Sequence, residues 1–290
     1  MHAYLIIAHT NWEQLQQLIS LLDDIRNDIY LHIDTKSKID EFHFKSNFSR
    51  IYYVDREDVR WGDVGSVIAE MKLFEMASHH GYQYYHLISG MDLPLHNQDY
   101  IHSFFERNNG KEFIGFGRVD WKVKDRVYCY NLFSRQMRHP IKIFRFVFKF
   151  IRLLGNWIQK SFSFYLTCNK IKGIDYRYGC NWVSVTHDFV TALLQSKEII
   201  ISMYQHSYCA DEIYKQTFAW NSRFKSNLFD IHDEFRGCMR EIDWKRGTPY
   251  VYRSDDYEML SGSKMIFARK FDDRIDSEIL TRIINKIRHE

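Results

Sequence analysis

The sequence predicts an α/β fold in which helices flank a mostly parallel central sheet. Its first third alternates segments with strand and helix patterns, as expected where helical crossovers join parallel strands. Apolar residues make up 45% of the 290 residues and aromatic residues 17%, which is enough for a substantial core. With only 3 prolines and 13 glycines, the composition argues against a disordered or linker-rich chain.

The elements of the first third follow in a regular order. Residues 3–8 form an apolar run that predicts the first strand. Residues 12–25 place Leu15, Leu18 and Leu22 at helical spacing, and Asn11 is a plausible N-cap. Strand, strand, helix and strand are then predicted in turn at 29–33, 50–54, 64–78 and 82–88.

The last part of the chain returns to mixed structure. We predict, in order, a strand, a helix capped by Thr186, a short helix, a strand and a closing helix, at 182–185, 187–196, 211–219, 239–244 and 273–288. There is no internal repeat and no low-complexity linker. We therefore expect a single domain over 1–290, with a nucleotide-binding half at 1–120, a basic aromatic segment at 126–174 and an acceptor and catalytic half at 176–290.

The middle segment has an unusual composition. No acidic residue occurs from Arg126 to Ile174, and cations recur at spacings of four and three at Arg138, Lys142, Arg145, Lys149 and Arg152. Apolar residues fill most positions between them, which favours a helix at a membrane interface that is too short and too charged to span. The alternatives are a buried helix whose basic stripe faces solvent, or a nucleic-acid-binding surface.

Charge and cysteine content narrow the function classes. A net charge of +3 is mild and identifies no partner. The five cysteines include no Cys-x-x-Cys pair, which argues against a disulfide framework or zinc knuckle and fits a reducing compartment. No basic n-region precedes the first strand, so we expect a cytosolic protein.

A polar turn follows the strand at 82–88, in the sequence Ser89-Gly90-Met91-Asp92-Leu93-Pro94. Proline restricts its own backbone and that of the preceding residue, so we expect strand pairing to stop here. Ligands of open α/β sheets bind where strands end, which makes this turn a candidate wall of an active site. The alternative is an ordinary strand-to-loop junction.

Four other segments carry side chains suited to nucleotide-sugar chemistry. Asp34 follows the second strand and could accept from a base N–H or a ribose hydroxyl. Trp61-Gly62 and Ser66 mark a helix start that could bind an anion or simply cap the helix. Asp211 could cap the next helix, which leaves Glu212 free to act as a general base.

Cations near the C-terminal end complete this set. Arg246 and Arg253 precede the block at 267–272, which holds Lys270, and converging cations would suit a diphosphate leaving group. The alternative is a solvated basic turn. The sequence contains no Asp-x-Asp, Walker loop, Gly-x-Gly-x-x-Gly or His-Glu-x-x-His, so a metal-clamped nucleotide sugar is not supported.

The order of these segments resembles the core-2/I-branching β-1,6-N-acetylglucosaminyltransferase family, which also holds peptide xylosyltransferases. The resemblance covers about residues 3–115 and 176–272, and rests on His32-Ile33-Asp34-Thr35-Lys36, Trp61-Gly62 with Ser66, the Ser-Gly-Met-Asp-Leu-Pro block, Asp211-Glu212 with Thr217, and the Phe-Ala-Arg-Lys-Phe block. It implies a GT-A-like fold and an inverting reaction that needs no divalent metal or other cofactor.

The resemblance also implies roles for single residues. Glu212 matches the catalytic base, although Ala210 stands where the family has proline. On the donor, Asp34 matches a contact to uracil or ribose and Lys270 a contact to the diphosphate. The remaining implied contacts are a second diphosphate cation at Arg253 or Arg246, the donor-side turn at Ser89, Gly90 and Asp92, an acceptor-packing ring at Trp244, and an acceptor cation at Arg126 within an approximate Lys-x-x-Arg.

These matches predict a bacterial-type glycosyltransferase. We expect it to move N-acetylglucosamine from a UDP-sugar to a glycan or lipid-linked glycan acceptor, in surface polysaccharide or lipopolysaccharide assembly. A xylosyltransferase using UDP-xylose is the alternative within the class. Outside it, the alternatives are a membrane-associated scaffold without catalysis, which Glu212 and Lys270 argue against, and a nucleic-acid-binding protein.

The expected location follows from the same reasoning. Eukaryotic relatives carry an N-terminal membrane anchor, and we expect none here because the first predicted strand begins at residue 3. We therefore expect an enzyme at the cytoplasmic face of the inner membrane, held on the anionic surface by residues 138–160 and without a nucleic-acid partner.

Overall fold

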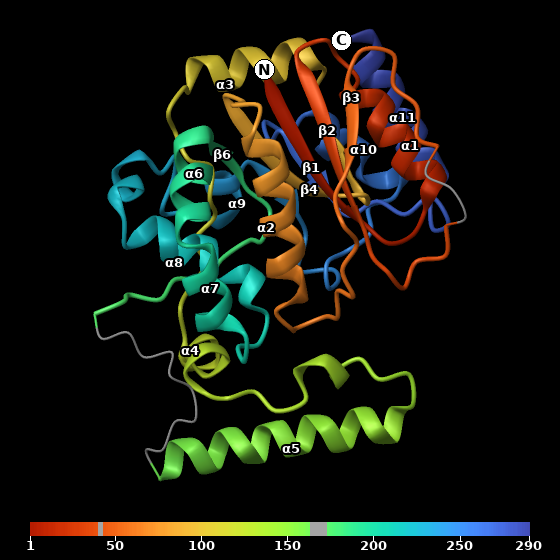
Figure 1. Ribbon diagram of the computed structural model, residues 1–290. Coiled ribbons are helices and arrows are strands. Elements are labelled where there is room, and N and C mark those ends of the chain that lie inside the picture. The colour runs from red at the N-terminus through yellow and green to blue at the C-terminus, as the bar shows by residue number, and fades with distance from the viewer. Residues whose placement is uncertain (40–42, 163–172) are drawn as a thin grey trace.

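A five-stranded sheet with the order β3-β2-β1-β4-β6 forms the centre of the computed structural model, which describes residues 1–39, 43–162 and 173–290 (Figure 1). Its strands are β1 (His2–Ala8), β2 (Asn27–Ile33), β3 (Arg50–Tyr53), β4 (Tyr84–Ser89) and β6 (Ser184–Thr186). The first four are parallel and β6 is antiparallel to β4. The prediction of a mostly parallel central sheet is confirmed.

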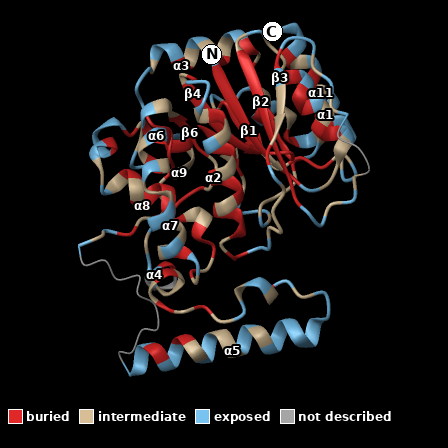
Figure 2. Ribbon diagram, in the orientation of Figure 1, coloured by how far each residue is buried: buried red, intermediate tan, exposed pale blue. Residues whose placement is uncertain are grey.

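Two apolar layers cover the faces of this sheet because side chains alternate along each strand. In β1, Tyr4 and Ile6 pack into one cluster with α1 (Trp12–Leu22), α3 (Gln98–Arg107) and α11 (Ser277–His289). Ala3 and Leu5 pack on the other face with α2 (Gly65–Ser78), α6 (His187–Gln195) and α8 (Tyr214–Trp220). Figure 2 shows both layers as a buried centre.

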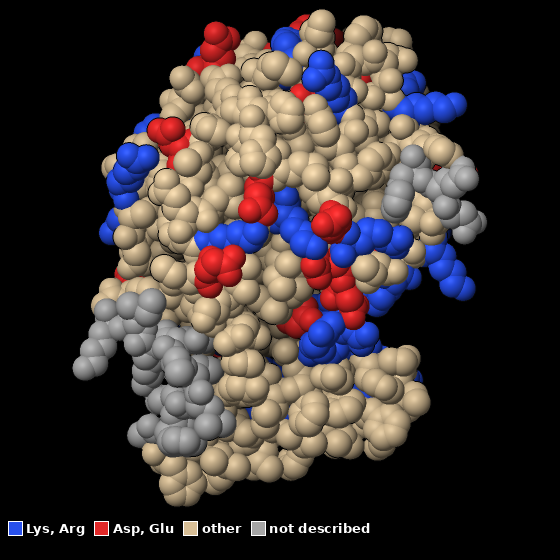
Figure 3. Space-filling model, in the orientation of Figure 1, with Lys and Arg blue, Asp and Glu red and all other residues tan. Residues whose placement is uncertain are grey.

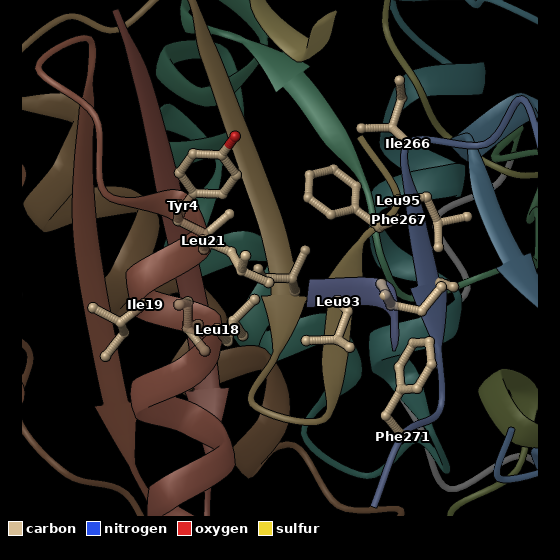
Figure 4. Close-up of a cluster of buried hydrophobic side chains, with 14 of the residues drawn as sticks. Tyr4, Leu18, Ile19, Leu21, Leu93, Leu95, Ile266, Phe267 and Phe271 are labelled. Atoms are coloured by element: carbon tan, nitrogen blue, oxygen red, sulfur yellow. The ribbon is translucent and has the colours of Figure 1, made fainter. Parts of the chain in front are cut away.

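A second, three-stranded sheet lies against the first and has the order β5-β8-β7. Its strands are β5 (Asp92–Pro94), β8 (Phe267–Arg269) and β7 (Arg240–Ile242). The chain stops pairing at Ser89 and turns at Gly90-Met91 as predicted, but it then pairs again as β5, which the sequence did not predict. Proline is tolerated because β5 is an edge strand. Figure 4 shows Leu93 between Leu18 of α1 and Phe271, and all three belong to one core cluster.

The basic middle segment forms an arm that lies along the foot of the molecule in Figure 1. It consists of α4 (Trp121–Tyr128), a 3-10 turn (Ser134–Gln136) and α5 (Lys142–Ser161). No helix in the described ranges combines the length and apolar character needed to cross a bilayer. Part of the predicted segment 126–174, including Cys168, lies outside the described residues.

The remaining helices connect these parts of the chain. They are α7 (Lys197–Tyr204), α9 (Glu234–Cys238) and α10 (Tyr257–Ser261). Thr186 caps α6 as predicted, since its side chain accepts from the Phe189 amide. Asn11 occupies the N-cap position of α1 as predicted, but its backbone is left-handed and its side chain donates to Asp272 at 2.9 Å instead of accepting from an amide of α1.

Candidate active site

The carboxyl ends of β1 and β4 lie side by side, where the strand order reverses direction. Ligands of open α/β sheets bind at such a switch point. The Gly90 amide, just past β4, donates to the Ile7 carbonyl of β1 at 3.0 Å. A Cβ at Gly90 would lie 3.0 Å from the Cβ of Ala8, so any larger residue would push the two strand ends apart.

Asp34 lies at the same edge, just past β2, and is largely buried. Its carboxylate accepts hydrogen bonds from the backbone amide and the Nζ of Lys36, each at 2.8 Å. The same Nζ lies 2.8 Å from Asp58. The position suits the proposed contact with uracil or ribose, although Lys36 already uses part of the acceptor capacity of Asp34.

The turn after β4 is fastened by Arg269 from β8. Asp92 accepts from the Ser89 amide at 2.9 Å, and Arg269 donates to both the Ser89 hydroxyl and the Asp92 carboxylate, at 2.6 and 2.7 Å. The polar side chains of Ser89 and Asp92 therefore hold the Arg269 guanidinium in place. The alternative, a solvated basic turn at 267–272, does not describe this block, because Phe267 and Ala268 are buried between β5 and β7.

Lys270 lies next to Arg269 and forms a pair of adjacent cations with it. Partial burial, and then the charge of Arg269, lower the pKa of Lys270. His9, just past β1, is exposed at this edge. Desolvation by the surrounding protein is the main cause that lowers the pKa of His9. The negative charge of Asp34 raises this pKa, and the positive charges of Lys270 and Arg269 lower it. His9 thus lies within electrostatic reach of both the Asp34 end and the cation pair.

Glu212 lies in a 3-10 turn (Ala210–Glu212) on the other side of the site. Arg126 of α4 donates to its Oε2 at 2.6 Å, and the Gly179 amide donates to its carbonyl at 3.0 Å. Among the described residues, no donor to Oε1 is recorded. The two residues predicted as the base and an acceptor cation are therefore in direct contact.

The Trp61-Gly62 turn supports the Glu212 turn from below. The Cys209 amide donates to the Gly62 carbonyl at 3.0 Å. Gly62 has φ +90, and a Cβ there would lie 2.6 Å from the ring of Tyr208, so glycine is required on both counts. Trp61 packs edge-on against the same tyrosine. Two motifs that are distant in sequence thus meet behind Glu212.

A buried ion pair lies beneath Glu212. Lys215 and Glu70 are fully buried, with 2.5 Å between Nζ and Oε2, and Tyr214 donates to the same oxygen at 2.7 Å. Lys215 also donates to the carbonyl of Asp211 at 3.0 Å. The prediction that Asp211 caps a helix was wrong, because Cys209 and Ile213 occupy the cap positions.

Glu234, at the start of α9, supplies a second carboxylate near Glu212. Desolvation, and then the charge of Glu212, raise the pKa of Glu234 to about 7. A Cβ on Gly117 would lie 2.8 Å from its Oε2, so the small residue makes room for the carboxylate. Tyr178 lies against the same glycine and beneath the Arg126 guanidinium.

Trp182 packs beside Arg269 in the candidate site. The guanidinium carbon of Arg269 lies 4.6 Å from the centroid of its ring. The ring also packs with Cys180 and Ile242, and the neighbouring Gly179 is bonded to Glu212. The structure records no direct contact between Glu212 and Lys270; Trp182 contacts Arg269, the neighbour of Lys270, and lies three residues after Gly179, which is bonded to the Glu212 carbonyl.

The other predicted residues lie near the end of β7. Arg246 is bound by Asp243 at 2.5 Å and by Asp256 at 2.7 Å, so its charge is already neutralised. Arg253 is exposed. Trp244 is 51% exposed and follows Ile242, which pairs with Arg269, so its ring is available for stacking on a sugar.

Among the described residues, neither a group of metal ligands nor the cavity at the opposite edge of the sheet coincides with the candidate site. Across residues 1–39, 43–162 and 173–290, no three or more His, Cys, Asp or Glu side chains are grouped so that they could hold a metal ion. A cavity of about 590 Å³ lies at the opposite edge of the sheet, where Gln83 precedes β4, and none of the predicted site residues lines it. The candidate site therefore lies at the carboxyl edge of the sheet, because the predicted base and cations are absent from the lining of that cavity.

Comparison with known proteins decides the family. A family model described as Core-2/I-Branching enzyme matches residues 2–260, nearly the whole chain. The chain belongs to this family. It is a glycosyltransferase. Comparison with curated proteins finds no match. Among solved structures, the apo form of mouse xyloside xylosyltransferase 1 is similar with a TM-score of 0.37 and 12% identity, over 92% of this chain and 97% of that one. At that score we draw nothing from the likeness.

Three residues of this Core-2/I-Branching enzyme had no role assigned from the sequence. Arg269 belongs to the block at 267–272. The structure shows that Arg269 is held beside Lys270 by Asp92, whereas the sequence had suggested Arg246 or Arg253 for this place. His9 follows the first strand, and its position there was the available signal. Glu234 carries no local signal, because only folding brings it near Glu212.

The raised pKa of Glu234 predicts a dependence of stability on pH. Its pKa is 4.5 ordinarily and about 7 when folded, so the folded state holds more protons between these values. The free energy of unfolding should therefore fall as pH rises from about 4.5 to about 7, and the term is constant outside that window. Urea unfolding at several pH values should show a smaller fall for Glu234→Gln than for the unsubstituted enzyme. Equal slopes would contradict this assignment.

Proposed function

We propose that this glycosyltransferase moves N-acetylglucosamine from its UDP donor to a hydroxyl of a glycan acceptor, with inversion and without a divalent metal. The observation that carries the proposal is the continuity of the site. Glu212 lies on one side and the adjacent cations Arg269 and Lys270 on the other, and the segment from Gly179 to Trp182 contacts Glu212 at its first residue and Arg269 at its last. A base and a cation pair in that relation match the two needs of a displacement at an anomeric carbon.

In the proposed reaction, Glu212 takes the proton from the acceptor hydroxyl. The acceptor oxygen attacks the anomeric carbon from the face opposite UDP, and the bond from that carbon to the diphosphate oxygen breaks. The departing diphosphate carries the negative charge, which Lys270 and Arg269 stabilise. Arg126 fixes the base through one carboxylate oxygen only, at 2.6 Å. Arg269 thus takes the role for which Arg253 and Arg246 were considered.

Donor and acceptor are proposed on different grounds. The family favours N-acetylglucosamine with a β-1,6 linkage, and UDP-xylose is the alternative within the same chemistry. For the acceptor we propose a glycan or lipid-linked glycan of bacterial surface polysaccharide or lipopolysaccharide. The same proposal places the enzyme at the cytoplasmic face of the inner membrane, against anionic lipid, through residues 138–160.

A panel of UDP-sugars tests the proposal. We expect UDP-N-acetylglucosamine to stabilise the protein most, by about 2.7 kcal/mol at a hundredfold excess over Kd, and to be hydrolysed slowly. Thermal unfolding and released UDP are measured with and without EDTA, and metal independence requires the same result in both. Stabilisation by UDP-xylose alone would select the alternative donor. Metal-reversible loss of activity in EDTA would contradict the role of the cation pair.

A further inference from the structure

Helix α5 carries a row of large apolar side chains that contact solvent along its whole length. Ile143, Phe146, Phe150, Leu153, Leu154 and Trp157 are each between 42% and 68% exposed. At about 100° per residue these six occupy one sector of the helix, roughly 100° wide. We call this sector the apolar face of α5. Figure 2 shows the helix as largely exposed, and Figure 3 shows an almost uncharged surface at the foot of the molecule.

The opposite face of α5 is polar and lies against the protein. The guanidinium carbon of Arg152 lies 4.2 Å from the centroid of the Tyr208 ring. Arg152 and the buried Asn156 both donate to Asn131, at 3.2 and 3.3 Å, and Gln159 accepts from the Tyr130 amide at 2.8 Å. Surface helices of soluble proteins normally bury the apolar side and expose the polar side. In α5 the arrangement is reversed.

The contacts of the arm's arginines also change the mode of binding expected from the sequence. Arg135 contacts Asp58 at 2.8 Å and Asp63 at 3.2 Å, and Arg138 stacks on the Trp61 ring at 4.3 Å. Together with Arg152, these cations are engaged by the protein itself. A basic stripe pressed against a charged membrane surface is therefore not what the structure presents.

We propose that the apolar face of α5 inserts into the interfacial layer of a phospholipid bilayer, with the helix axis parallel to the membrane. A helix of 20 residues is about 30 Å long and lies flat along the foot of the molecule, so the whole face can enter one leaflet (Figure 1). The exposed Lys142 and Lys149 lie at one border of the face, where their charges can reach the headgroups.

Charge complementarity favours lipid over a protein partner. No acidic residue occurs between Arg126 and Ile174, so α5 itself carries no carboxylate that would repel anionic headgroups, and Asp125 of α4 is paired with Lys160 at 2.7 Å. The bordering lysines add attraction to an anionic leaflet, and the apolar face supplies binding that does not depend on lipid charge. A straight, protruding helix with aromatic and aliphatic side chains in one row fits a planar lipid layer.

Insertion would also orient the active site, a step that rests on the proposed function. Arg135 of the arm contacts Asp58, and Asp58 contacts Lys36, which holds Asp34 at the carboxyl edge of the sheet. Figure 3 shows charged side chains of both signs gathered between the body and the arm. The edge that would bind the donor therefore faces the lipid side of the molecule, which suits an acceptor carried on a lipid.

Flotation of the full chain with vesicles tests the insertion. We expect binding to neutral phosphatidylcholine vesicles, tighter binding when phosphatidylglycerol is added, and persistence of the neutral-vesicle binding at high salt. The triple variant Phe146→Ser/Phe150→Ser/Trp157→Ser should bind at least about 100-fold more weakly, since each ring loses apolar burial in lipid. The matched control Phe48→Ser/Ile199→Ser removes exposed apolar side chains elsewhere and should bind like the unsubstituted protein.

Other outcomes would overturn the proposal. Binding to anionic vesicles only, abolished by salt, would mean electrostatic docking without insertion. Binding to neither vesicle, or self-association that the triple variant abolishes, would mean that the body or a second copy covers the face. The triple variant should keep the same thermal stabilisation by UDP-sugar. This readout separates failure of insertion from failure of the proposed function, since donor binding requires no membrane.

Discussion

Replacement of Glu212 by glutamine is expected to lower kcat at least about 100-fold while the fold stays intact. General-base catalysis contributes roughly 10²–10⁴-fold, and glutamine keeps the shape of the side chain but cannot take the acceptor proton. The contact with Arg126 at 2.6 Å can be retained in part through the amide oxygen. Initial rates with donor and acceptor, and thermal unfolding of the same samples, measure the two quantities separately.

A matched control makes this result specific. Glu198 is exposed in the first turn of α7, and Glu198→Gln should leave kcat unchanged. UDP-sugar should stabilise Glu212→Gln as it stabilises the unsubstituted enzyme, since the donor cations are untouched. An unchanged rate in Glu212→Gln would remove this residue from the mechanism and leave Glu234 as the next carboxylate to test.

Lys215→Met is expected to lower the free energy of unfolding by about 3–5 kcal/mol. Lys215 and Glu70 are both fully buried, so removing the ammonium leaves a carboxylate without its counter-ion in the protein interior. The methionine chain fills most of the vacated volume, which confines the effect to the charge. Urea unfolding followed by circular dichroism measures the loss.

Two further variants distinguish this explanation from loss of packing. The double variant Glu70→Leu/Lys215→Met removes both charges, and we expect it to be more stable than Lys215→Met alone. Lys264→Met changes an exposed lysine and should shift the free energy of unfolding by less than about 0.5 kcal/mol. If the double variant is no more stable than the single one, the carboxylate is not the cause.

The larger sheet could be predicted because its information is local. Short apolar segments predicted β1 to β4. A helix follows β1 and another follows β3, and such helical connections favour parallel strands, as observed. The smaller sheet could not be predicted, because its strands have three residues each and come from distant parts of the chain. Three residues carry too little periodicity, and burial by tertiary contacts decides their conformation.

The site could be predicted to the extent that motifs carried it. Glu212, Asp34 and the block around Lys270 were predicted from residue type and order, and of these Asp34 and the block lie where strands of the larger sheet end, since Asp34 follows β2 and Arg269 contacts Ser89 of β4. The involvement of Arg269 and of the second carboxylate, Glu234, could not be predicted in this way. Both depend on which residues the fold brings close together. The orientation of α5 depends on contacts such as Arg152 on Tyr208, which no helical pattern records.

The contact between Arg135 and two aspartates has a practical consequence for anyone wishing to shorten the protein. The arm looks like an appendage that could be trimmed to gain solubility, yet its removal would take a cation from both Asp58 and Asp63. Asp58 shares Lys36 with Asp34, so the loss would reach the residue that we propose to contact the nucleotide. We expect serine substitutions on the apolar face of α5 to improve solubility without that damage, because they leave the contacts of Arg135 unchanged.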